Sequence, residues 1–321
     1  MQATASIVQK IRSNPKIPAP SQTVFKILQL TKDPESDIRD VASLISQDAG
    51  LTAQLLRQAN SALYGCSSPT SSVSDACMRL GFKRIRSAVI NQHIVNGLGD
   101  ARPPGFDAHR YWQSAFAISV AAGDLCKKLL PKSVEEAGTA GLLCDVGIGL
   151  LAFGLPHEYQ GVLASRSGPS PLPLHEIEKR KLGLTHAEVG AAVLEDWKLG
   201  EEIIEAVKHH HADPMNPDLA ELSSFARIIA AASTLAEIAL EGSDMDRVSC
   251  LFAHVDTLSP EADALVNDLL DGLVAHIQQS AESMSIELGS VDEMKTNFEA
   301  MVSSLPDVSG RFSHRPMSRD E

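Results

Sequence analysis

Histidine and aspartate side chains give this chain its main capacity for chemistry. Residues 209–211 are three consecutive histidines, with His186 and Asp145 earlier in the sequence. Imidazole nitrogens and carboxylate oxygens are ligands of divalent metal ions, so these residues are candidates for a metal site. We favour a structural role, in which the histidine run ends a helix beside Pro214 and complements the carbonyl end of the helix dipole. Asp145 would then accept hydrogen bonds between helices.

The cysteines do not add a second metal-binding pattern. Their number is odd, they are widely spaced, and no two of them form a C-x-x-C pair, which argues against a disulfide framework and a thiolate zinc site. We expect each to be a small buried apolar residue. The five are Cys66, Cys77, Cys126, Cys144 and Cys250.

The charge balance argues against nucleic acid as a partner. Acidic residues outnumber basic residues by 41 to 28, and the net charge of -13 repels a polyanion. Basic residues do follow a glycine turn, at Lys83, Arg84 and Arg86, where they resemble part of a helix-turn-helix reader. Three basic residues in so acidic a chain are expected to form a solvated helix face.

The elements that must position these side chains are helices. Apolar residues recur at three- and four-residue spacing, bounded by Ser, Asp, Pro or Gly, and alternating strand patterns are scarce. We therefore predict an all-α fold of short helices with brief loops. Thr185 and Glu188 form a Thr-x-x-Glu capping box, so a helix should begin at His186 and lead to a buried Trp197.

The helices are expected to divide into two lobes. Residues 97–107 are rich in Gly and Pro and cannot continue a helix, so we place a lobe boundary at residue 100. This predicts an N-terminal helical lobe at 1–100 and a second helical lobe at 101–285. Residues 286–321 should form a C-terminal helix and a disordered tail.

The chain shows no pattern of a membrane span or of secretion. Its apolar stretches are interrupted within a few residues, well short of the roughly 18 consecutive apolar residues of a span. The N-terminus lacks the basic-then-apolar order of a secretory signal. We expect a cytoplasmic protein with no membrane partner.

Several segments, taken in order, resemble the HDOD domain family, a regulatory and degenerate branch of the HD and HD-GYP phosphohydrolase superfamily. The strongest match is Leu-Arg-Gln-Ala-Asn-Ser-Ala-Leu-Tyr-Gly at 56–65. In the second half, 140–147 stands where catalytic relatives carry Gly-Leu-Leu-His-Asp-Ile-Gly, 185–190 resembles a later His-x-x-x-Gly helix, and 207–211 matches paired histidines. The resemblance implies a two-lobed helical fold whose second lobe is HD-domain-like.

The resemblance also identifies the ligands that catalysis would need. In catalytic relatives, imidazole and carboxylate groups from several helices hold metal ions that polarise a phosphate and generate hydroxide. The corresponding positions here are Gln113, Cys144, Asp145 and about Ser233, and only Asp145 is a good ligand. We therefore expect no catalytic residue and no activity as an enzyme.

A reduced metal site is the alternative. Positions comparable to His186, His210 and His211 bind metal in some catalytic relatives, so these three residues and Asp145 are the residual candidates. Because each missing ligand weakens metal binding, we expect no metal and no other cofactor, with a divalent ion at a reduced site as the alternative.

The first-lobe signature allows two roles. Asn60 and Tyr64 bracket a helix end, so the motif can serve to cap that helix, which we favour. Alternatively, Arg57, Asn60 and Tyr64 line a groove between the lobes and bind a ligand or peptide.

The resemblance implies a non-catalytic module of bacterial signal transduction that acts by binding a signalling protein partner or a small ligand. Two other classes stay open. A metal-dependent phosphohydrolase or phosphodiesterase depends on the ligand set, and a DNA-binding regulator is disfavoured by the acidity. The sequence does not specify the oligomeric state.

The tail should be dispensable for folding. Residues 306–321 carry too little apolar surface to offset the entropy lost on ordering them. A chain truncated after Leu305 should keep a melting temperature within a few degrees of the full-length value, measured by circular dichroism. A larger drop would mean that the tail packs on the helices.

Overall fold

Helices make up the regular structure, as the apolar periodicity predicts. The computed structural model describes residues 2–14, 20–60, 69–99, 103–166, 172–214, 221–242, 245–283 and 291–304, and no strand occurs among them. The all-α prediction is confirmed. In chain order the helices are α1 (Gln2–Ser13), α2 (Gln22–Leu30), α3 (Ile38–Ile45), α4 (Ala49–Ala59), α5 (Val73–Gly99), α6 (Ala108–Leu129), the 3-10 turn η2 (Pro131–Ser133), α7 (Val134–Leu143), α8 (Val146–Gly154), α9 (Pro156–Ala164), α10 (Leu174–Leu182), α11 (His186–Asp196), α12 (Glu201–His209), α13 (Ser224–Glu241), α14 (Met245–Asp256), α15 (Ala262–Ser283) and α16 (Val291–Ser304).

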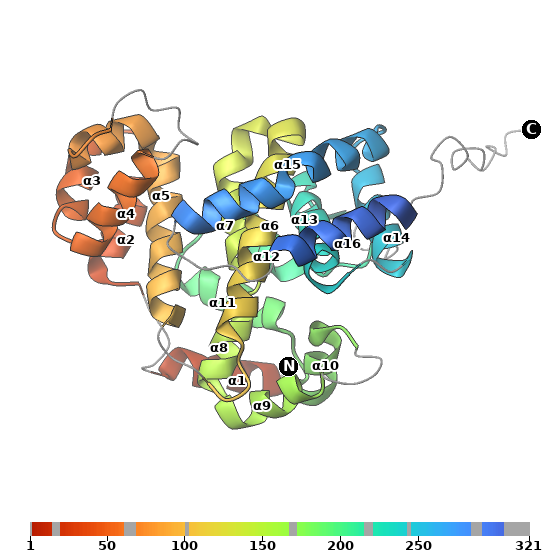
Figure 1. The fold of residues 1–321 in the computed structure, drawn as a ribbon. Coiled ribbons are helices and arrows are strands. Elements are labelled where there is room, and N and C mark those ends of the chain that lie inside the picture. Colours follow the sequence, from red (N-terminus) through yellow and green to blue (C-terminus); the bar gives the residue numbers. More distant parts are fainter. Residues whose placement is uncertain are drawn as a thin grey trace, which may run out of the picture.

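Helices α2 to α5 form the first lobe, seen at the left in Figure 1. Their starts are set locally, because Asp37 and Asp48 accept backbone N–H bonds at the beginning of α3 and α4. The apolar stripes of α3 and α4 then bury Ile45 and Leu55 completely or nearly so. Gly81, with φ 73° and ψ 168°, divides α5 into two helical parts.

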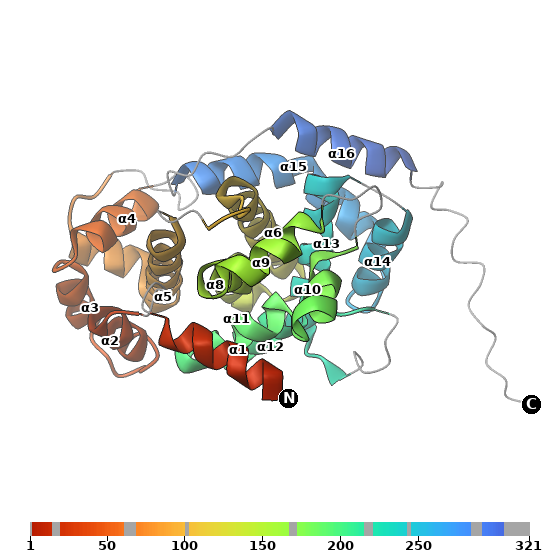
Figure 2. The ribbon, with the colours of Figure 1, turned by 90° about the horizontal axis from the view of Figure 1, so that it is seen from below.

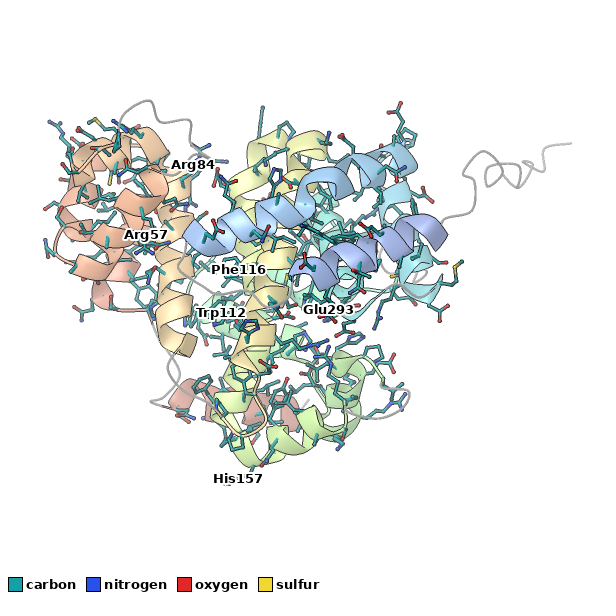
Figure 3. All side chains as sticks on the ribbon, viewed as in Figure 1. Arg57, Arg84, Trp112, Phe116, His157 and Glu293 are labelled. Carbon is teal, nitrogen blue, oxygen red and sulfur yellow. The ribbon has the colours of Figure 1, made fainter. Side chains whose placement is uncertain are left out.

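The basic residues that follow Gly81 link the two lobes. Lys83 pairs with Glu136 at 2.9 Å, and Arg84 pairs with Glu135 at 2.8 Å, both across to α7. Figure 3 shows Arg84 on the side of α5 that faces the second lobe. The two basic side chains are 55% and 38% exposed, so they are partly solvated, as expected, but they also hold α5 to α7.

The second lobe is built around two long helices, α6 and α13, which pack against each other and against α7. Nearly every side chain of the middle of α13 is buried, which suits a helix enclosed on several sides. Helix α15 packs on α6, α16 packs on α13, and the two lie together along one side of the lobe (Figures 1 and 2). Trp197 is 7% exposed, which confirms its predicted burial.

Helix α1 lies against the second lobe although it is the first element of the chain. It packs on α8 and α11, buries Val8 and Ile11, and is followed by Asn14, whose Nδ2 donates to the carbonyl oxygen of Phe153 at 3.1 Å. The division at residues 100 and 285 remains a prediction. The predicted tail at 306–321 lies outside the described residues.

One stretch, Pro131–Gly154, is long and apolar enough to cross a membrane by length and composition alone. It comprises η2, α7 and α8, and 83% of its most apolar window is buried inside the protein. Such extensive burial is typical of a segment in the core of a folded protein.

Burial of His254 on α14 should make stability depend on pH. His254 is 4% exposed, and burial lowers the pKa of its imidazole to about 4. Between pH 6.5 and 4 the unfolded chain therefore binds a proton that the folded chain does not. The stability that neutral His254 contributes to the folded state is complete above about pH 6.5 and is lower by roughly 2 kcal/mol at pH 5.

The variant His254→Gln should lose this dependence. Urea unfolding at pH 7.5 and pH 5 should show a smaller drop in unfolding free energy for the variant than for the wild type. Equal drops would mean that His254 is not held neutral in the folded state.

Candidate metal centre

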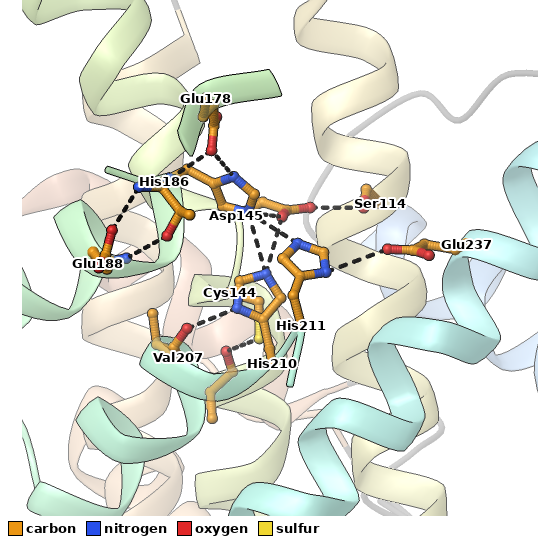
Figure 4. Close-up of polar contacts among 12 residues, drawn as sticks. Ser114, Cys144, Asp145, Glu178, His186, Glu188, Val207, His210, His211 and Glu237 are labelled. Atoms are coloured by element: carbon orange, nitrogen blue, oxygen red, sulfur yellow. Dashed lines mark hydrogen bonds and ion pairs between the residues drawn. The ribbon is translucent and has the colours of Figure 1, made fainter. Parts of the chain in front are cut away.

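Four side chains converge in the interior of the second lobe (Figure 4). Asp145 precedes α8, His186 is the first residue of α11, His210 directly follows the end of α12, and His211 comes next. One ligand atom from each residue lies within 4.8 Å of every other. The fold thus brings together all four of the residual candidates that the sequence identifies.

The spacing of these atoms fits a single metal ion. His186 Nε2 lies 3.3 Å from His210 Nε2 and 3.1 Å from His211 Nε2. Asp145 Oδ1 lies 3.5 Å from His186 Nε2 and 3.6 Å from His210 Nε2. Ligands about 2.0–2.1 Å from a tetrahedral ion are separated by ~3.3 Å, so these four distances match four of the six edges of such a site, and the other two are at most 4.8 Å.

The outer nitrogen of each imidazole faces a hydrogen-bond acceptor. His186 Nδ1 lies 2.7 Å from a Glu178 oxygen, and His210 Nδ1 lies 2.7 Å from the Val207 carbonyl. His211 Nδ1 lies 3.4 Å from a Glu237 oxygen. In the tautomer that these acceptors favour, each ring carries its proton on Nδ1 and turns the lone pair of Nε2 toward the centre.

Neutral rings oriented this way cannot hydrogen-bond to one another, because three acceptor nitrogens face a common point. A positive charge between them, from a proton or a metal ion, is required to make their approach favourable. Burial and the neighbouring histidines His210 and His186 lower the pKa of His211 well below its usual value, whereas Glu178 and Asp145 outweigh burial and raise the pKa of His186, so an added proton would stay on His186. A divalent ion can take the place of that proton, and the donor set fits one.

Two buried carboxylates add negative charge around the histidines. Burial alone would raise the pKa of Asp145, but hydrogen bonding with His210 and the charge of His186 lower it to about 2. Ser114 Oγ also donates to Asp145 at 2.7 Å. Glu178 is fully buried, and despite that burial its pKa is lowered by the charge of His186 and by hydrogen bonds.

Glu178 anchors the outer side of the site. It accepts bonds from the backbone N–H of His186 at 2.7 Å and from the Tyr159 hydroxyl at 2.5 Å. Sequence reasoning missed Glu178, Tyr159 and Ser114, because none of them stands in a motif with the ligands. The nearest available signal was that Glu178 lies eight residues before His186, across the α10–α11 turn.

Cys144, which stands next to Asp145 in the resembled motif, does not supply a metal ligand. Cys144 is fully buried, burial raises the pKa of its thiol well above the usual value, and Sγ donates to the Ala140 carbonyl at 3.3 Å. Cys77 and Cys126 are buried and free as well, as expected, whereas Cys250 is partly buried. Cys66 lies outside the described residues.

The structural role predicted for the histidine run is only partly right. Helix α12 does end at His209, and His210 does meet a carbonyl of its last turn. However, the side chains of His210 and His211 turn into the interior, where they are 0% and 18% exposed, instead of complementing the dipole from solvent.

The first-lobe signature is described in part. Asn60 ends α4, donates to the Thr70 carbonyl at 2.9 Å and accepts from the Thr70 N–H at 2.8 Å. The Asn60 side chain thus joins the end of α4 to the segment before α5, and capping of α4 by the motif stays a prediction. Arg57 is exposed on α4 (Figure 3), whereas Tyr64 lies outside the described residues. Binding by these residues stays a prediction.

Known proteins share this sequence pattern and fold. The sequence profile of the HDOD domain matches residues 17–213, which include all four residues of the centre. An uncharacterized protein of Treponema pallidum (strain Nichols) is 26% identical over 218 residues, or 67% of this chain. The match covers only 40% of that relative's length.

Three solved structures show the same fold. An HDOD domain protein with unknown function from Geobacter sulfurreducens is 23% identical, with 88% of this chain and 98% of that chain covered and a TM-score of 0.69. A proposed phosphohydrolase from Shewanella amazonensis SB2B is 24% identical, with 87% and 98% covered and a TM-score of 0.68. A proposed metal-dependent phosphohydrolase of the same organism is 19% identical, with 88% and 99% covered and a TM-score of 0.62.

The position of His186 depends on a close contact between α8 and α11. A Cβ atom added at Gly147 would lie 1.9 Å from the carbonyl oxygen of His186, so only glycine permits this approach. Gly147→Ala should therefore cost about 3 kcal/mol or more, because backbone must move. Urea unfolding measures the loss.

Gly161 on α9 provides the control, since a Cβ there meets nothing within 4 Å. Gly161→Ala should be neutral or should stabilise by about 0.5–1 kcal/mol through helix propensity. Similar stabilities for the two variants would contradict the importance of the α8–α11 contact.

Proposed function

The chain belongs to the HDOD domain family, and from this membership and its buried centre we propose that it is a regulatory domain that acts by binding rather than by turnover. We further propose that Asp145, His186, His210 and His211 hold one divalent metal ion. This is the alternative that the sequence left open, and the geometry favours it over a site without metal.

The observation that carries the proposal is that the ligand set is closed and buried. Three imidazoles and one carboxylate fill a tetrahedral site, and catalytic sites usually keep one position open for water or substrate. The side chains of His186 and Asp145 are 1% and 9% exposed. An ion held here would join α8, α11 and α12 and would neutralise buried negative charge, which is a structural or sensory role.

The positions that resemble the ligands of catalytic relatives mostly carry poor ligands. Two-metal hydrolysis needs a second cation beside the first to stabilise the attacking and leaving oxygens. Of the positions that resemble those ligands, Cys144 is a neutral thiol and Ser233 is a buried hydroxyl, 1% exposed. Gln113 carries an amide, which is a poor ligand.

The partner that we propose is a signalling protein in the cytoplasm. The net charge of -13 disfavours nucleic acid, and Lys83 and Arg84 are engaged with α7. Arg57, Asn60 and Tyr64 remain the candidate contact residues in the first lobe. Neither nucleic acid nor a membrane is proposed as a partner.

A metal-dependent phosphohydrolase is the second candidate. The names of the two Shewanella amazonensis structures and the Asp–His centre favour it. In that case the ion would polarise a phosphate oxygen and lower the pKa of a bound water. Metal content and turnover together distinguish the two functions.

Protein purified without a histidine tag should contain about one divalent ion per chain by elemental analysis. His186→Gln and His211→Gln should each lose most of that metal, because each removes a ligand. His157→Gln is the matched control, since His157 is exposed on α9 (Figure 3) and is not one of the four ligand residues, and should keep its metal. Metal at background level in the wild type would contradict the single-ion centre.

Turnover of cyclic dinucleotides and simple phosphate esters with added metal should be absent. The regulatory proposal fails if turnover occurs and is lost together with the metal in Asp145→Ala. Metal without turnover is the expected outcome.

A further inference from the structure

Arginines from three elements converge beside the centre. Glu241, at the end of α13, pairs with Arg110 of α6 at 2.7 Å, with Arg247 of α14 at 2.8 Å, and with Arg166, which follows α9. We call these three arginines around Glu241 the arginine cluster. Arg110 and Arg166 both contact the same carboxylate oxygen, Oε1.

The cluster concentrates positive charge on one carboxylate. Arginine stays protonated at every physiological pH, so three positive charges face Glu241. Two of the three guanidinium groups meet the same oxygen of Glu241, in a chain whose net charge is -13. Such a local concentration of positive charge attracts an anion.

Two of the arginines, Arg110 and Arg166, also have hydrogen-bonding capacity to spare. A guanidinium group offers five N–H donors in a planar fork that matches two oxygens of a phosphate or carboxylate. Arg110 and Arg166 each give one terminal nitrogen to Glu241, instead of pairing with both of its oxygens. Their side chains are 46% and 35% exposed, so an anion from solvent can reach them.

The cluster lies on the side of the centre that solvent reaches. His211 is 18% exposed and Glu237 is 37% exposed, whereas His186 is 1% exposed. Glu237 contacts His211 from α13 (Figure 4), and Glu241 follows Glu237 on the same helix. An anion on the arginines would therefore lie beside the centre without replacing any of its ligands.

We propose that the arginine cluster binds the phosphate group of a small phosphorylated organic molecule. A phosphate offers the several acceptor oxygens and the double negative charge that three guanidinium groups can meet together. This goes beyond the proposed function, because it needs neither the metal ion nor a protein partner.

The test is isothermal titration calorimetry of the full chain with AMP and with inorganic phosphate at low salt. AMP should bind, more tightly than inorganic phosphate, and added NaCl should weaken it. Arg166→Gln and Arg110→Gln should each weaken AMP binding by about tenfold or more. Arg180→Gln is the control, because Arg180 is 65% exposed and pairs only with Glu176 on α10. It should bind as the wild type does.

Two further variants separate a binding site from a structural ion-pair cluster. Glu241→Gln removes the carboxylate that competes for the arginines, so AMP affinity should rise, whereas a purely structural cluster would lose stability without gaining affinity. Arg166→Lys keeps the charge but loses the fork, so it should fold and bind AMP more weakly than the wild type.

Three results would overturn the proposal. They are no AMP binding at millimolar concentration, equal binding by the wild type and Arg166→Lys, and loss of binding when metal is removed with EDTA. The last result would place the phosphate on the metal ion. Metal content is measured separately, so failure of the phosphate-binding proposal can be told apart from failure of the single-ion centre.

Discussion

Two carboxylates buried in one interior are the constraint on which the second lobe depends. An ionised side chain removed from water is unfavourable unless charge and hydrogen bonds compensate for it. Asp145 and Glu178 are 6% and 0% exposed, and His186 lies between them with one ring nitrogen toward each. Ser114 and Tyr159 supply hydroxyl donors from α6 and α9. The requirement to match two negative charges thus dictates which helices meet and in what orientation.

The side chains of the centre come from the ends of helices. Asp145, His186 and His210 each stand at a helix boundary, where the chain changes direction and a side chain can point along the interior instead of sideways into a neighbour. The contact at Gly147 then sets the distance between α8 and α11. Rigid backbone contacts place the imidazoles, and hydrogen bonds to their outer nitrogens set the tautomers. This is the support that a metal centre needs.

Of the positions that resemble the catalytic ligand set, only Asp145 is a good ligand, which changes the chemistry open to such a scaffold. A closed, four-ligand site holds helices together, whereas hydrolysis needs an open position and a second positive charge. Beside the centre, partly exposed positive charge lies in the arginine cluster, on the side of His211 that faces solvent. Stability and ligand recognition would then be served by neighbouring but separate groups of side chains on α13 and the helices that pack against it.

Local patterns in the sequence determined the helical fold, the capping box at Thr185 and the burial of Trp197, because helix periodicity and capping act over a few residues. The family followed from motifs of fixed spacing. Tertiary structure alone decided the centre and the arginine cluster. Ser114 and Asp145 are 31 residues apart, and Arg110 and Glu241 are 131 apart, and no periodicity encodes such distances. Counting lost ligands along the sequence favoured a site without metal. Whether the remaining side chains can hold an ion depends on their separation in space, which only the packing of α8, α11 and α12 determines.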